Sequence, residues 1–92
     1  MSGMSKAATE RHRRLQEDVR YDVLDVLIEH GHCVVQEVAE YTGHPVARTY
    51  AALIALEVRG YTAVDGRSQM RNKPLWTVTD AGRVYAITPI AG

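Results

Sequence analysis

The stretch from residue 34 to residue 61, VVQEVAEYTGHPVARTYAALIALEVRGY, carries the clearest structural pattern of the chain. In its first part the apolar residues recur at helical rather than alternating spacing, which predicts a short amphipathic helix. A tight turn follows, where Gly43 can take a positive φ and Pro45 suits the first turn of a new helix. The second helix has a stripe at i, i+3, i+4 and i+7 that predicts core packing. The stripe consists of Thr49, Ala52, Leu53 and Leu56.

Two helices joined by a short turn that contains glycine form a helix-turn-helix. Within it, AEYTG at residues 39–43 and LEVRGY at residues 56–61 resemble the A-E-x-x-G and L-E-x-x-G-Y steps of winged-helix transcription regulators. That group includes the MarR-like, PadR-like and ArsR-like families. LWTVTDAGR at residues 75–83 resembles the closing strand of the group and its L-T-x-x-G-R step. The resemblance covers roughly residues 18–86 and implies an α+β winged helix-turn-helix fold, with three helices and a small antiparallel β-hairpin wing.

The length and composition suit one small globular domain. The chain has 92 residues, of which 46% are hydrophobic, and no apolar run approaches the roughly 18 residues of a membrane span. The charged stretch at residues 6–20 lacks the apolar centre of a signal peptide. One cysteine excludes an internal disulfide and suits a reducing compartment. We therefore expect a cytoplasmic, nucleoid-associated protein with no membrane partner.

The remaining elements follow from periodicity and turn residues. We expect a flexible tail over residues 1–9, a winged-helix domain over residues 10–86 and a C-terminal tail over residues 87–92. Within the domain, the patterns predict a first helix over residues 10–30 and a short strand over residues 32–34. Further strands are expected at residues 61–64 and 75–79, and a short helical turn is expected from residue 79 to residue 85. Period two directs Trp76 and Val78 of the last strand towards the core.

The charge is balanced overall but not along the chain. The formal net charge is zero, yet basic residues cluster near the N-terminus and within the expected wing tip, residues 65–73. The resemblance implies that the second helix of the motif enters the major groove while the wing holds phosphates. The candidate DNA contacts are His44, Ala47, Arg48, Tyr50 and Ala51 on the helix, Arg67, Arg71, Asn72 and Lys73 on the wing, and Arg11, Arg13 and Arg14 near the N-terminus. The N-terminal arginines are equally consistent with a solvated helix face paired with nearby acids.

The expected function is sequence-specific binding of double-stranded DNA by a small transcriptional regulator, a repressor acting as a homodimer. Helix one and the apolar stretch at residues 87–90 are the expected dimer contacts. However, the second helix of the motif has an unusually apolar outer face, formed by Ala47, Ala51, Ile54 and Ala55. The alternative is therefore a protein partner: an adaptor or antirepressor that docks through this face.

Enzymatic and metal-dependent functions have little support in the sequence. The chain contains no glycine-rich phosphate loop, nucleophile motif or pair of carboxylates at a catalytic spacing. The run His30-Gly31-His32-Cys33 has metal-ligand residue types, but no second cluster completes a set of three or four ligands. We predict no enzyme, no cofactor and no metal site. A metal- or redox-responsive regulator using His32 and Cys33 is the third alternative.

Overall fold

The computed structural model of the protein describes residues 18–87. In chain order its elements are α2 (Asp18–His30), α3 (Val35–Thr42), α4 (Val46–Val58), β1 (Thr62–Arg67), β2 (Pro74–Val78) and α5 (Asp80–Ile87). The predicted N-terminal tail, the first turns of the predicted first helix and residues 88–92 lie outside the described residues. The predicted domain boundaries therefore stay predictions.

The core forms where α2, α3 and α4 meet the inner face of the hairpin. The predicted stripe of α4 is buried at all four positions, and both Trp76 and Val78 of β2 are buried as predicted. The α2 residues that face this core are Val19, Val23, Leu24 and Leu27. Val38 of α3 completes the core. The hydrophobic periodicity of each helix thus determines which face it buries.

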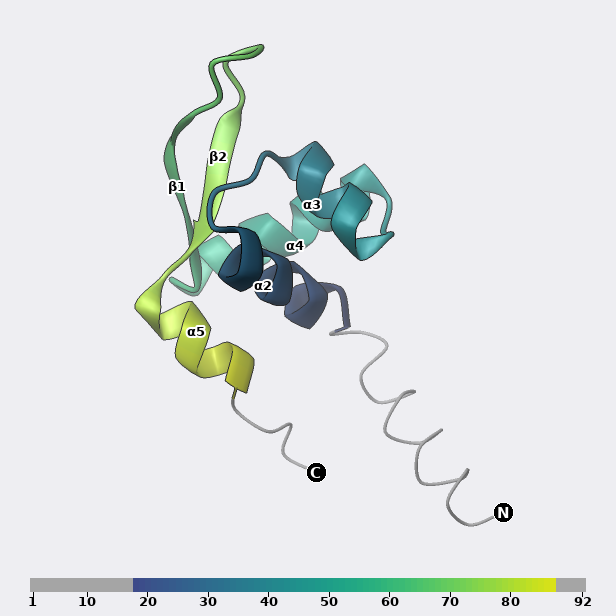
Figure 1. Cartoon of the computed structure of the whole chain (residues 1–92). Helices are drawn as coiled ribbons and strands as arrows, with labels where there is room; N and C mark the ends of the chain where they lie inside the picture. The colour runs from purple at the N-terminus through teal and green to yellow at the C-terminus, as the bar shows by residue number, and fades with distance from the viewer. Residues whose placement is uncertain (1–17, 88–92) are drawn as a thin grey trace, which may run out of the picture.

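The sheet is a two-stranded antiparallel hairpin with a third, much shorter partner. Thr62 pairs with Val78, and Val64 pairs with Trp76. On the other edge of β2, Trp76 exchanges two backbone hydrogen bonds with Cys33, at 3.0 and 2.7 Å. The strand predicted over residues 32–34 is therefore reduced to this single bridge. Figure 1 shows the hairpin tip extending beyond the helices, at the opposite end of the molecule from α5.

The last helix, α5, is longer than the short turn that the sequence predicts, so residues 18–87 contain four helices. Thr79 caps it, because its hydroxyl accepts a hydrogen bond from the N–H of Gly82 at 3.0 Å. Tyr85 of α5 stacks on two other tyrosines. Its ring centroid lies 5.4 Å from that of Tyr21 in α2 and 4.4 Å from that of Tyr61, just before β1. This tertiary packing stabilises a helix whose glycine lowers its intrinsic propensity. None of the helices within residues 18–87 has the length and hydropathy needed to cross a membrane.

Candidate nucleic-acid interface

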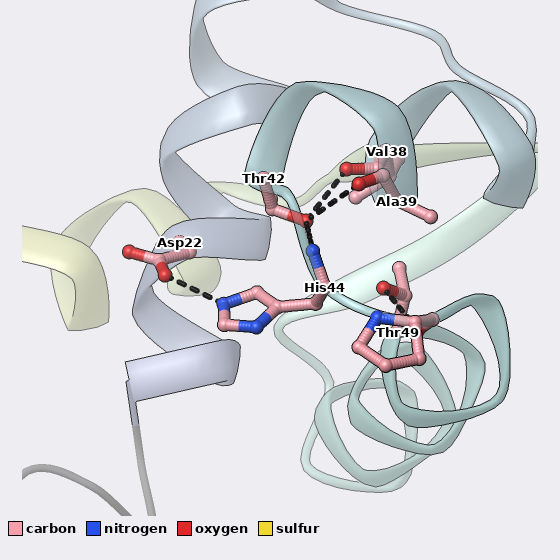
Figure 2. Close-up of polar contacts among 7 residues, drawn as sticks. Asp22, Val38, Ala39, Thr42, His44 and Thr49 are labelled. Carbon is pink, nitrogen blue, oxygen red and sulfur yellow. Dashed lines mark hydrogen bonds and ion pairs between the residues drawn. The ribbon is translucent and has the colours of Figure 1, made fainter.

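The turn between α3 and α4 is closed by the side chain of Thr42 (Figure 2). Its hydroxyl donates to the carbonyl of Val38 at 2.9 Å and accepts from the N–H of His44 at 3.3 Å. Gly43 follows with a φ of 78°, in the left-handed region that glycine adopts without a steric penalty. Its N–H donates to the carbonyl of Ala39 at 2.9 Å. The turn predicted from the sequence is present, and these hydrogen bonds set the direction in which α4 begins.

Two contacts hold the beginning of α4 against its neighbours. Thr49 has no exposed surface, and its hydroxyl donates to the carbonyl of Pro45 at 3.0 Å. The ring of His44 reaches α2, where its Nε2 lies 2.8 Å from Oδ2 of Asp22. His44 is half-buried in this contact. Of the candidate DNA contacts on this segment, it is therefore the one whose side chain turns inward, towards another helix.

The face of α4 that points away from the core carries mostly small or uncharged side chains. Ala47, Arg48 and Ala51 are exposed, and Tyr50 is 49% exposed. Arg48 is the one charged residue between Val46 and Leu56.

The predicted apolar outer face is narrower than the sequence pattern indicates. Ile54 is partly buried and packs on the core, and Ala55 is also partly buried. The prediction failed here because Ile54 lies at the edge of the stripe, where the packing of neighbouring elements decides which side chains are covered.

The hairpin is attached directly to α4. The ring of Tyr50 meets Trp76 of β2 edge to face, with centroids 6.3 Å apart and an interplanar angle of 82°. At the start of β1, the buried hydroxyl of Thr62 donates to the carbonyl of Leu53 at 3.0 Å. The first contact ties the exposed face of α4 to the hairpin through Tyr50, and the second ties its buried side to the start of β1.

The tip of the wing is shorter than predicted and is internally bonded. β1 extends to Arg67, so residues 65–67 belong to the strand rather than to the loop. Across the tip, the N–H of Ser68 donates to the carbonyl of Lys73 at 2.7 Å. The guanidinium of Arg67 donates to the carbonyl of Asn72 at 2.9 Å. The structure thus brings together three of the four candidate wing residues, and Arg67 uses at least one of its donors inside the wing.

A β-bulge in β1 was not predicted from the sequence, and the side chain of Asp65 within it contacts His32. The register shifts by one residue between Val64 and Arg67, and Gly66 within this segment has a φ of 87°. Asp65 in the bulge accepts a hydrogen bond from His32, whose Nε2 lies 2.8 Å from Oδ2. A glycine inside a strand pattern is the signal that would have indicated the bulge.

Cys33 is buried against the core rather than exposed for chemistry. Desolvation by burial raises the pKa of its thiol, and the nearby carboxylate of Glu37 raises it further. The thiol stays protonated at neutral pH and behaves as a small apolar side chain. Within residues 18–87, no three His, Cys, Asp or Glu side chains converge in a way that could hold a metal ion.

The charges of the described residues are divided between two parts of the fold. Residues 18–42, which contain α2 and α3, have six acidic residues and one basic residue. Residues 46–78, which contain α4 and the wing, have two acidic and five basic residues. The local potential at α4 and the wing is therefore more positive than the neutral total implies. Arg11, Arg13 and Arg14 lie outside the described residues.

Comparison with known proteins identifies the fold. No family model matches the chain, and no curated protein matches it in sequence. Solved structures do match. PcaV, a transcriptional regulator from Streptomyces coelicolor, superposes with a TM-score of 0.74 at 18% identity, over 90% of this chain and 64% of its own. NMB1585, a MarR family regulator from Neisseria meningitidis, superposes with a TM-score of 0.68 at 20% identity, over 92% of this chain and 61% of NMB1585. The fold is that of the MarR-type winged helix.

A third match is BpsR of Bordetella bronchiseptica, whose DNA binding is regulated by 6-hydroxynicotinic acid. It superposes with a TM-score of 0.69 at 23% identity, and the match covers 92% of this chain and 71% of BpsR. The chain spans about two thirds of the length of each of these three regulators. At such identities the similarity establishes the winged-helix fold alone. The helix-turn-helix and wing predicted from the sequence are thereby confirmed as elements of that fold.

Proposed function

We propose that the protein binds double-stranded DNA as a small transcriptional regulator, a repressor, through the exposed face of α4 and the wing. The observation that carries this proposal is the contact of Tyr50 with Trp76, 6.3 Å between ring centroids. It joins the outer face of the second helix of the motif to the wing, so that both can reach one DNA surface together. The excess of basic residues over residues 46–78 gives this surface the charge that phosphates require.

In the proposed complex, α4 enters the major groove. Ala47 and Ala51 let the helix approach the base edges closely and can contact thymine methyl groups. Arg48 is the donor that reaches a guanine or a phosphate, and Tyr50 donates its hydroxyl to the backbone. His44 acts through position rather than contact, because its bond to Asp22 orients the beginning of the helix.

The wing supplies the electrostatic part of the binding. Arg71 and Lys73 contact phosphates or the minor groove on the side of the duplex next to α4. Arg67 and Asn72 hold the shape of the tip through their hydrogen bond of 2.9 Å. The three arginines at residues 11–14 add phosphate contacts from the N-terminal arm. This function belongs in the cytoplasm, at the nucleoid.

We propose that two copies act together as a homodimer. Ile87 at the end of α5 is 80% exposed, and Val84 one turn earlier is also exposed. The proposed contacts are these side chains, the part of the predicted first helix that precedes Asp18, and the stretch at residues 88–90. A dimer with two-fold symmetry would read two half-sites about one helical turn apart. Analytical ultracentrifugation tests this directly, and a monomeric mass at micromolar concentration would contradict it.

The alternative partner is a protein. Val46 and Tyr50 are large, exposed and adjacent on α4, which also suits docking against an apolar surface. The withdrawal of Ile54 into the core reduces the apolar area available for such docking. We therefore propose DNA as the primary partner and retain protein docking as the outcome to consider if DNA fails to bind.

The test is fluorescence anisotropy of a labelled mixed-sequence duplex, titrated at several salt concentrations. We expect salt-sensitive binding by the natural protein. An Arg71→Ala/Lys73→Ala variant should bind more weakly, with a salt slope shallower by about one to two units, since each lost phosphate contact removes about 0.9.

The matched control removes the same charge elsewhere. An Arg20→Ala/Arg83→Ala variant loses two positive charges on α2 and α5, which are not part of α4 or the wing, and should keep most of the slope. Equal losses in the two variants would show that net charge, rather than the wing, drives binding. Absence of binding by the natural protein even at low salt would refute the proposal.

A further inference from the structure

Met70 has an unusual position for an apolar side chain. It lies at the tip of the wing, in the loop between β1 and β2, and is 79% exposed. Burial of a methionine side chain would be favourable, but the tip is remote from the core, at the end of the hairpin (Figure 1). Polar residues surround it on both sides in the sequence, from Arg67 to Lys73. The tip of the basic hairpin therefore exposes one large, flexible apolar side chain.

The backbone beneath Met70 is held in one shape. Its N–H donates to the hydroxyl of Ser68 at 3.2 Å, and the N–H of Ser68 donates across the tip to Lys73 at 2.7 Å. The bond from Arg67 to the carbonyl of Asn72 closes the same loop from the other strand. With three hydrogen bonds across few residues, the backbone that carries Met70 has little conformational entropy left to lose on binding.

The residues that follow Met70 are in a conformation that few side chains adopt. Arg71 has a φ of 67° and Asn72 a φ of 54°, both in the left-handed region. Asparagine tolerates this region, but arginine is rarely found there, and glycine would relieve the strain. Strained residues kept without glycine cluster at binding surfaces. These two residues lie in the turn that leads back to β2, and Arg71 follows Met70 directly in the sequence, so a basic residue stands next to the exposed methionine.

We propose that Met70 is a wedge that enters the minor groove and partly unstacks one base step, while Arg71 and Lys73 hold the flanking phosphates. This inference rests on the proposed DNA binding and specifies how the wing contributes to sequence preference. Apolar side chains such as methionine insert between base pairs and kink the duplex towards the major groove. Because pyrimidine–purine steps unstack most easily, the wedge would favour sites with a TA or CA step beneath the wing.

The experiment uses a short duplex of repeated TA steps in which 2-aminopurine replaces one adenine, titrated with the full chain until anisotropy shows saturation. With the natural protein we expect the 2-aminopurine fluorescence to rise, because the probe is quenched while stacked. Met70→Ala should bind about tenfold more weakly, with an unchanged salt slope, and should not raise the fluorescence at saturation. Met70→Leu should restore both signals, since leucine keeps an apolar side chain of similar size.

The control is Gln69→Ala, which shortens the exposed neighbour and should leave affinity and fluorescence unchanged. If the natural protein binds with a normal salt slope but the fluorescence does not rise, the wedge is refuted and the DNA-binding proposal stands. The same conclusion follows if Met70→Ala raises the fluorescence as the natural protein does. If the natural protein does not bind the duplex at all, the proposed function fails and this inference fails with it.

Discussion

Replacing Gly82 with alanine tests whether close packing or helix propensity controls α5. Gly82 is buried in the first turn of the helix, where α5 crosses the segment that leads into β1. A Cβ at this position would overlap the carbonyl oxygen of Tyr61 and would lie 2.7 Å from Cγ2 of Val78. The carbonyl of Tyr61 cannot move easily, because it accepts the N–H of Thr79 at 3.1 Å.

Two opposing effects determine the size of the change. Alanine has a higher helix propensity than glycine, which alone would stabilise the protein by up to about 1 kcal/mol. Forcing an extra methyl group against packed neighbours costs about 1–3 kcal/mol, and the upper part of that range applies when the obstacle is backbone. We therefore expect the free energy of unfolding to fall by about 2 kcal/mol, or the Tm by roughly 10 °C for a domain of this size.

The assay is urea denaturation followed by the fluorescence of Trp76, the only tryptophan and a buried one. Ala81→Gly is the control, because it changes an exposed neighbour in the same turn and should cost at most about 1 kcal/mol through propensity alone. A Gly82→Ala variant as stable as the natural protein, or more stable, would refute the close approach of α5 to Tyr61.

Three further predictions follow from single contacts. Thr49→Val should lower the free energy of unfolding by about 0.5–1.5 kcal/mol in urea denaturation, because it removes a buried hydrogen bond from the hydroxyl to the carbonyl of Pro45 that water cannot replace. Cys33 should react with a thiol reagent far more slowly in the folded protein than in urea. Burial and Glu37 raise the pKa of the Cys33 thiol, so at high pH the folded state binds more protons than the unfolded state. The free energy of unfolding should therefore decline above the ordinary thiol pKa and be unaffected below it. A Cys33→Ala variant should lack this alkaline decline. A double-mutant cycle of Asp22→Ala and His44→Ala should give a coupling of about 0.2–1 kcal/mol, because the pair is partly exposed; a larger value would contradict that reasoning.

Much of the fold could be predicted because its signals are local. The stripe of α4, the turn at Gly43 and the inward direction of Trp76 each depend on spacing within a few residues, and all three are confirmed. The lengths of β1 and α5 were underestimated. β1 continues through a bulge at Gly66, and α5 is stabilised by the stack that Tyr85 makes with tyrosines distant in sequence.

The candidate site divides in the same way. The sequence was sufficient to identify the basic residues of the wing and the second helix of the motif as the candidate interface. It could not show that His44 turns towards Asp22, or that Ile54 packs into the core, because each depends on where α2 and the sheet lie. Those placements reduce both the polar contacts and the apolar area that the pattern of α4 alone suggests.

By itself, therefore, the sequence determined the helix-turn-helix, the faces that become core and the position of the basic wing, because periodicity and turn residues act over short distances. Only the tertiary structure decided which side chains stay available on the surface. The bond of Arg67 to Asn72, the left-handed backbone at Arg71 and the exposure of Met70 arise when the two strands pair across the bulge. Strand register depends on all residues of both strands at once, so no local pattern specifies what the tip presents.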